Sequence, residues 1–126
     1  MASKMLHTCL RVQDLEASIE FYQKAFGFYE KRRRDFPDYQ FTIVYLGLEG
    51  DDYELELTYN YDHGPYVVGD GFAHIALSVP DLEESHASHQ AAGYTVTEPK
   101  GLPGNPPNYY FVLDPDGYKV EVIREK

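Results

Sequence analysis

Cysteine is nearly absent from the sequence, since Cys9 is the only one among 126 residues. A single cysteine cannot form an internal disulfide, which is typical of proteins in a reducing compartment. Long apolar runs are also missing, because no stretch approaches the roughly 20 residues that span a bilayer. The opening residues, MASKMLHT, lack the apolar stretch of a signal peptide. We therefore expect a soluble cytoplasmic protein that has no membrane partner.

Basic residues are scarce, with 11 Lys and Arg against 21 Asp and Glu, and the net charge is −10. This charge would repel the phosphates of nucleic acids, so it argues against nucleic acid as a partner. Apolar residues make up 43% of the chain, which is enough to build the core of one compact domain. The length suits one compact domain or two very small halves that share a core.

One short pattern is present twice in the chain. Residues 5–18 and 72–85 align at a constant offset of 67, and seven of the fourteen aligned pairs are identical. Further along, YELEL from Tyr53 resembles YKVEV from Tyr118 at an offset of 65. Two copies are too few for a solenoid, so the pattern indicates duplication of a half-domain.

Each half is predicted to contain a strand, a helix and three further strands. Asp14 and Asp81 are suitable N-caps, and the helices that follow them are expected to end at Gly27 and Gly93. Alternating polar and apolar residues, with many β-favouring types, predict the strands. These cover residues 6–12, 28–34, 40–47 and 53–61 in the first half and 72–79, 94–98, 108–114 and 118–124 in the second.

The fold class that follows is α+β, with mixed sheets. We expect one domain over residues 1–126, built of two tandem βαβββ modules at residues 5–62 and 72–124. The apolar face of each sheet can pack under its helix, which leaves the opposite faces to line a cup.

Strand alternation places four potential ligands on the faces that line this cup. His7, Glu56, His74 and Glu121 lie on four different strands, as a histidine and then a glutamate in each half. Two imidazoles and two carboxylates suit a divalent transition metal, and two carboxylates in one cavity repel each other without a cation. Any one of the four, taken alone, is better explained as a polar residue on a solvated face. Their duplication favours a metal site.

Four segments resemble glyoxalase I, the lactoylglutathione lyase family of the vicinal-oxygen-chelate superfamily. These segments are LHTCLRVQDLEASIEFY, ELTYN, FAHIALSV and DPDGYKVEVI. The resemblance extends over nearly the whole chain. It implies the glyoxalase/bleomycin-resistance/dioxygenase fold, with metal ligands at His7, Glu56, His74 and Glu121. A histidine as first ligand and a short chain are similar to the bacterial type activated by Ni²⁺ or Co²⁺, with Zn²⁺ as the alternative.

The same resemblance implies an activity and a substrate. The reaction converts the hemithioacetal of methylglyoxal and a thiol, expected to be glutathione, into a lactoyl thioester. Glu121 is implied as the base that moves a proton between adjacent carbons, with Glu56 as the symmetric second carboxylate. Arg11 and Asn60 match residues that bind the γ-glutamyl end of glutathione, and Lys100 is a candidate for binding the thiol's carboxylate.

Assembly and two other kinds of function stay open. Sites in most relatives take ligands from both chains, so a homodimer is expected. Other metalloenzymes of this scaffold are antibiotic-modifying thiol transferases, acyl-CoA epimerases and extradiol dioxygenases. These enzymes generally bind their metal with three protein ligands. A fourth ligand at Glu56 therefore argues against them. Non-enzymatic drug-binding modules lack the metal set altogether. Cys9 shares the His7 face and is expected to be a filler residue there.

Overall fold

The structure is a computed structural model that describes residues 2–126. It divides into two compact units, one ending at Val67 and the other beginning at Val68. Each unit contains one sheet and one α-helix. Neither helix in the described part of the chain is long and apolar enough to cross a membrane.

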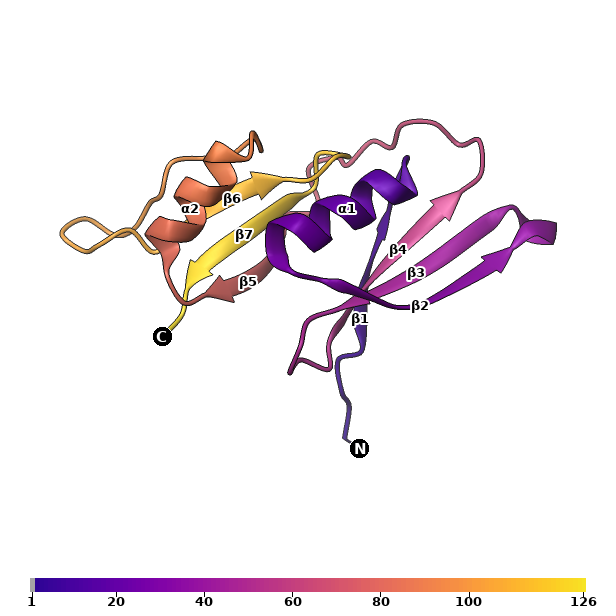
Figure 1. Ribbon diagram of the computed structural model, residues 1–126, viewed down its shortest axis with the longest axis horizontal. Coiled ribbons are helices and arrows are strands. Elements are labelled where there is room, and N and C mark those ends of the chain that lie inside the picture. Colours follow the sequence, from indigo (N-terminus) through magenta and orange to yellow (C-terminus); the bar gives the residue numbers. More distant parts are fainter. Residues whose placement is uncertain (1) are drawn as a thin grey trace. The chain divides into compact units, whose positions relative to one another are not determined.

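The first unit contains a four-stranded mixed sheet with strand order β1-β4-β3-β2 and helix α1 against one face (Figure 1). Strand β1 runs parallel to β4, whereas β3 is antiparallel to both of its neighbours. The predicted order of one strand, one helix and three strands is confirmed here. Its elements are β1 (His7–Arg11), α1 (Leu15–Phe26), β2 (Tyr29–Phe36), the 3-10 turn η1 (Pro37–Tyr39), β3 (Phe41–Gly47) and β4 (Glu54–Asn60).

Helix α1 begins and ends at the predicted residues. The Asp14 side chain accepts a hydrogen bond from the backbone N–H of Ala17 at 3.1 Å, which satisfies one free donor of the first turn. Gly27 ends the helix in the left-handed conformation with φ of 81°, which glycine adopts without steric cost. Phe21 and Tyr22 are buried, and they fix the helix against one face of the sheet.

The two faces of this sheet differ sharply in what they present. Leu10, Val44 and Leu57 are buried on the face that α1 covers. Because side chains alternate along a strand, the neighbouring residues His7, Tyr45 and Glu56 belong to the face away from the helix. The packed helix therefore determines which face is left for polar chemistry.

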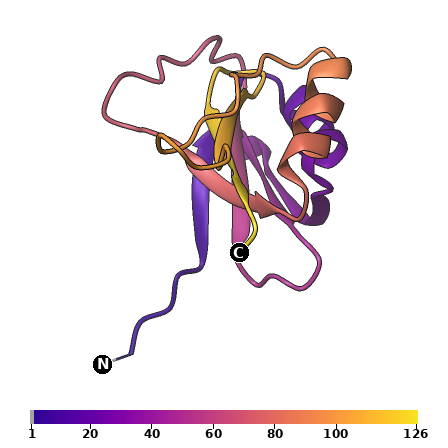
Figure 2. The same cartoon turned by 90° about the vertical axis from the view of Figure 1, so that its left-hand side faces the viewer.

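The second unit contains a three-stranded sheet with strand order β5-β7-β6, and Figure 2 shows helix α2 along one side of it. Strand β5 is parallel to β7, and β6 is antiparallel to β7. Asp81 caps α2 by accepting from the backbone N–H of Glu84 at 3.0 Å. The elements are β5 (Ile75–Val79), α2 (Leu82–Ala91), β6 (Tyr109–Leu113) and β7 (Lys119–Arg124).

The strand predicted over residues 94–98 is not formed. Val96 makes only an isolated bridge to Val112, although Thr97 N donates to Phe111 O at 3.0 Å. The Thr97 hydroxyl explains the interruption, because it accepts the Phe111 N–H at 2.9 Å in place of a backbone carbonyl. A threonine side chain that competes with the backbone in this way breaks the regular ladder.

Candidate functional site

The first unit brings together His7 and Glu56, as predicted. Strands β1 and β4 are paired in parallel with Cys9 opposite Glu56, so His7 lies one pleat away on the same face. Its Nε2 atom is 3.2 Å from Glu56 Oε1. The edge of the imidazole meets the ring of Tyr45, with centroids 5.7 Å apart, and this contact restricts how the histidine can turn. One nitrogen and one oxygen donor therefore face each other on the sheet face away from helix α1, where Glu56 is buried and His7 is partly exposed.

The other side of the Glu56 carboxylate is held by neighbouring side chains. Thr58 Oγ1 donates to Oε2 at 2.8 Å, and Cys9 Sγ donates to the same oxygen at 3.1 Å. The hydroxyl of Tyr45, opposite Glu56 on β3, is also within hydrogen-bonding reach of this carboxylate. Burial raises the pKa of Glu56, but the hydrogen bonds from Cys9, Thr58 and Tyr45 outweigh it and hold the pKa below its usual range. Glu56 is therefore ionised at neutral pH, as a metal ligand must be.

Cys9 is a hydrogen-bond donor in this arrangement and not a nucleophile. Partial burial raises the pKa of its thiol, and the negative charge of Glu56 reinforces that shift, although the hydrogen bond with Thr58 opposes it. Because only the thiolate is strongly nucleophilic, a raised pKa lowers the reactivity of the Cys9 thiol. The sequence predicts that Cys9 is a filler residue, and the structure adds that its Sγ donates to the candidate ligand Glu56.

The second unit contains an equivalent His–Glu pair with the same distance between its donor atoms. His74 lies directly before β5, and its Nε2 atom is 3.2 Å from Glu121 Oε1 on β7. Phe111 lies opposite Glu121 on β6, as Tyr45 lies opposite Glu56. The ring of Phe111 meets the edge of the His74 imidazole at 5.4 Å between centroids. Duplication has thus preserved the histidine, the glutamate and the aromatic ring beneath them.

The spacing within each pair fits two ligands of one divalent ion. Donor atoms about 2.1 Å from a metal lie about 3.0 Å apart at right angles and about 3.4 Å apart in a tetrahedron. The observed 3.2 Å in each pair falls between these values. Among residues 2–126, no group of three or more His, Cys, Asp and Glu side chains is gathered as a metal site. The structure therefore presents these candidate ligands as two pairs, one in each unit.

Arg11 and Asn60 lie near the same end of the first sheet. Arg11 is paired with Thr58, and Asn60 lies two residues further along β4, so both belong to the face that carries Glu56. Asn60 Nδ2 donates to the hydroxyl of Tyr66 at 2.9 Å. The sequence alone did not single out Tyr66, because it lies in the irregular segment after β4 and no periodic pattern marks it.

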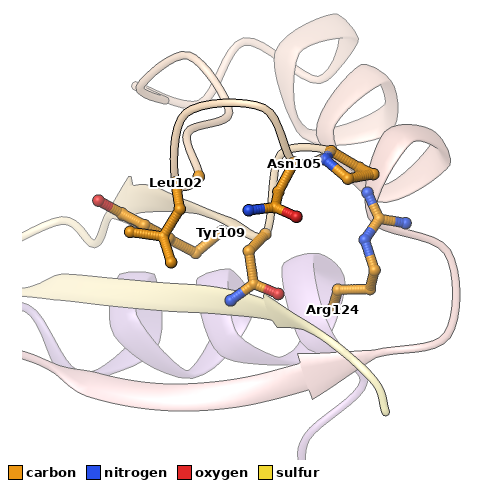
Figure 3. Close-up of a pocket in the computed structure, with 7 residues that line it drawn as sticks. Leu102, Asn105, Tyr109 and Arg124 are labelled. Atoms are coloured by element: carbon orange, nitrogen blue, oxygen red, sulfur yellow. The ribbon is translucent and has the colours of Figure 1, made fainter.

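Lys100 lies in the second unit, at the start of the Pro- and Gly-rich loop. Its backbone is fixed, with N donating to Tyr109 O at 2.8 Å, while its side chain is exposed. Figure 3 shows Leu102 and Asn105 of this loop beside Tyr109 and Arg124. These four residues are among those that line a cavity of about 420 Å³. Neither Lys100 nor the His74–Glu121 pair is among the residues that line it.

A larger hollow of the first unit, about 730 Å³, also lies away from the candidate ligands. It is lined by α1 and by the strand residues facing that helix, among them Asp14, Glu16 and Arg33. Arg33 is already paired with Glu16 at 3.0 Å and with Glu30 at 2.8 Å. Neither His–Glu pair is among the residues that line this hollow or the smaller cavity of the second unit.

Comparison with known proteins agrees with this geometry. Residues 4–122 match the model of the Glyoxalase/Bleomycin resistance protein/Dioxygenase superfamily. A probable lactoylglutathione lyase of Vibrio cholerae is 40% identical over 127 residues, covering 98% of this chain and 91% of its own. The lactoylglutathione lyase of Haemophilus influenzae is 40% identical over 126 residues, covering 98% and 93%.

A solved structure extends the likeness to three dimensions. The trypanothione-dependent glyoxalase I of Leishmania major has a TM-score of 0.87 and 35% identity, covering 98% of this chain and 88% of that one. The resemblance noted in the sequence and the predicted fold class are both confirmed. The chain belongs to the Glyoxalase/Bleomycin resistance protein/Dioxygenase superfamily and, within it, to the lactoylglutathione lyase (glyoxalase I) family.

Proposed function

We propose that this protein is a lactoylglutathione lyase, which converts the hemithioacetal of methylglyoxal and glutathione into a lactoyl thioester. The observation that carries the proposal is the duplicated His–Glu pair, with 3.2 Å between donor atoms in each unit. Relatives named lactoylglutathione lyase are 40% identical over nearly the whole chain.

The four ligands proposed for one divalent metal ion are His7, Glu56, His74 and Glu121. Ni²⁺ or Co²⁺ is favoured over Zn²⁺ because the first ligand is a histidine, and neutral imidazole nitrogens with carboxylate oxygens suit these ions. When bound, such a metal stabilises negative charge that develops on the substrate oxygens. The low pKa of Glu56 supports this role, because the carboxylate is already ionised before any metal arrives.

The base is Glu121, and Glu56 is the second carboxylate of the catalytic pair. The proton leaves the carbon that bears sulfur, which gives an enediolate, and it returns to the adjacent carbon that becomes the lactoyl alcohol carbon. A single carboxylate can take and give back this proton if it reaches both carbons. Glu121 has less of its surface buried than Glu56, with 18% against 11% of the side chain exposed.

Arg11 and Asn60 are the residues proposed to bind the γ-glutamyl end of the thiol. They lie on the face that carries Glu56, one offering a cation and the other an amide. Lys100 is proposed to bind the carboxylate at the other end of the thiol. Glutathione is favoured over the trypanothione used by the Leishmania major relative, since the bacterial relatives are named for lactoylglutathione.

The proposed assembly is a homodimer in the cytoplasm, with one domain over residues 1–126 made of modules 5–62 and 72–124. A partner chain is proposed to complete the site, as the resemblance to glyoxalase I implies. A single cysteine and the lack of any spanning helix among residues 2–126 are compatible with the cytoplasm.

Thioester formation from methylglyoxal and glutathione tests the proposal. The protein is stripped with a strong chelator, and turnover is followed by ultraviolet absorbance after addition of Ni²⁺, Co²⁺ or Zn²⁺. We expect no turnover without metal and recovery with Ni²⁺ or Co²⁺. Full activity after rigorous metal removal would contradict the metal site, and no thioester with any metal would favour a drug-binding module or another metalloenzyme of the superfamily.

A further inference from the structure

The two equivalent glutamates differ in the side chains that surround them. Around Glu56 the neighbours in register are Cys9 on β1, Tyr45 on β3 and Thr58 two residues along β4. All three have a side-chain hydrogen-bond donor. We name these three residues the Glu56 clamp.

The clamp leaves only one side of the carboxylate free. Thr58 Oγ1 and Cys9 Sγ both donate to Glu56 Oε2, at 2.8 and 3.1 Å, and they also contact each other at 3.3 Å. The other oxygen, Oε1, faces His7 Nε2. Tyr45 lies opposite Glu56 on β3, so its side chain is a third neighbour of the carboxylate.

The second unit has no such donors at the corresponding places. Strand register puts Ala76 opposite Glu121 on β5, where Cys9 lies opposite Glu56. Phe111 takes the place of Tyr45 on β6, and Ile123 takes the place of Thr58 on β7. A methyl group, a phenyl ring and an aliphatic chain cannot donate a hydrogen bond to the Glu121 carboxylate.

A difference of this kind gives the two carboxylates different chemistry. Hydrogen bonds to a carboxylate fix its orientation, which makes it a better fixed ligand. Partners of this kind around metal ligands change metal affinity or activity by about 10- to 100-fold when they are removed. The donors that hold Glu56 have no counterparts at Ala76, Phe111 and Ile123, so the orientation of the Glu121 carboxylate is less restricted.

We propose that Cys9, Tyr45 and Thr58 are positioning residues that clamp Glu56 as a permanent metal ligand, and that the absence of donors from Ala76, Phe111 and Ile123 leaves Glu121 free to move the proton. This inference rests on the proposed function and explains how one duplicated sequence serves two roles. In this proposal the Cys9 thiol and the Tyr45 hydroxyl act on Glu56, while the Tyr45 ring also contacts His7.

Removing the clamp tests the first half of the inference. The variant Tyr45→Phe/Thr58→Val is compared with wild type by competition of Co²⁺ with a chelating dye and by the visible spectrum of bound Co²⁺. We expect Co²⁺ affinity to fall by about 10- to 100-fold, with an altered spectrum. Tyr39→Phe is the matched control, because it removes an exposed hydroxyl of the same unit. Thr58→Ser retains the hydroxyl donor and should bind Co²⁺ with wild-type affinity.

Moving the clamp to the other glutamate tests the second half. The variant Phe111→Tyr/Ile123→Thr places donors around Glu121 in the register that Tyr45 and Thr58 have around Glu56. We expect kcat to fall by about tenfold or more, with KM nearly unchanged and Co²⁺ affinity equal or higher. Simple damage to the fold would instead weaken Co²⁺ binding, and circular dichroism and thermal unfolding check the fold directly.

Three outcomes separate this inference from the proposed function. If Tyr45→Phe/Thr58→Val binds Co²⁺ with wild-type affinity and spectrum, the clamp is disproved even though the enzyme is active. If Phe111→Tyr/Ile123→Thr retains wild-type kcat, the freedom of Glu121 is disproved. If the wild-type protein binds Co²⁺ but forms no thioester, the proposed function fails, while the affinity comparison still decides whether the clamp positions Glu56.

Discussion

Arg32 donates two hydrogen bonds to Glu54, from Nη1 to Oε2 at 2.6 Å and from Nη2 to Oε1 at 2.9 Å. The same guanidinium lies over the ring of Tyr45, 3.9 Å from its centroid. Lys31 adds a further contact to Glu54 at 3.1 Å. This paired charge cluster therefore supports the aromatic ring on which His7 lies.

Glu54 is expected to stabilise the fold in a pH-dependent way. The hydrogen bonds from Arg32, with those from Lys31, lower the pKa of Glu54 to about 2, although burial opposes them. Because the pKa is depressed on folding, the stabilisation is complete above the unfolded value of about 4.3 and is lost as the pH falls toward 2. Glu54→Gln should lower the free energy of unfolding at neutral pH by about 1 kcal/mol.

Denaturant unfolding between pH 7 and pH 2 checks this prediction. The difference between Glu54→Gln and wild type should shrink steadily below about pH 4.3. Glu49→Gln, which neutralises an exposed carboxylate of the same unit, is the control and should show little change. A difference that stays constant across the whole range would show that the pKa of Glu54 is not depressed.

Glu121→Gln should lose most of its turnover while still binding some metal. The amide cannot accept the substrate proton, whereas His7, Glu56 and His74 remain available as ligands. We expect kcat to fall by at least about 100-fold. Metal content by mass spectrometry, measured beside the rate of thioester formation, separates loss of the base from loss of the metal. Full activity in this variant would remove Glu121 from the role of base.

Arg11→Ala and Asn60→Ala should raise KM for the glutathione hemithioacetal more than they lower kcat. Both side chains are proposed to bind a part of the thiol that does not react, so they contribute binding in the ground state and transition state alike. Loss of one charge-assisted hydrogen bond corresponds to roughly tenfold in kcat/KM. Steady-state kinetics measures the split. An equal fall in kcat with unchanged KM would place these residues in the chemical step.

Tyr110→Phe should destabilise the second unit by about 1–3 kcal/mol. Its ring is fully buried, and its hydroxyl bonds Ser85 Oγ at 2.6 Å and His89 Nδ1 at 2.8 Å. Losing the hydroxyl leaves a polar group of helix α2 without that partner in the buried layer. Thermal unfolding measures the loss, and Tyr109→Phe on the same strand, whose ring is only half-buried, is the control. Equal stability of both variants would contradict the importance of the buried bonds.

Much of the fold followed from local patterns. Asp14 and Asp81 mark helix starts because their side chains cap free backbone donors, a purely local interaction. The failed strand at residues 94–98 shows the limit, because Thr97 takes the Phe111 N–H only when the two segments are side by side. Sequence periodicity contains no information about such a competitor from across the sheet.

The sequence by itself determined that His7 and Glu56 share one face, and His74 and Glu121 another, because side chains alternate along a strand whatever its neighbours are. It could not assign partners to Cys9 or Tyr45, since their contacts with Glu56 depend on the register between strands. Register is decided by the packing of whole strands against a helix, which is a tertiary property. The pairing of donors with Glu56, and of apolar groups with Glu121, was therefore visible only in the folded structure.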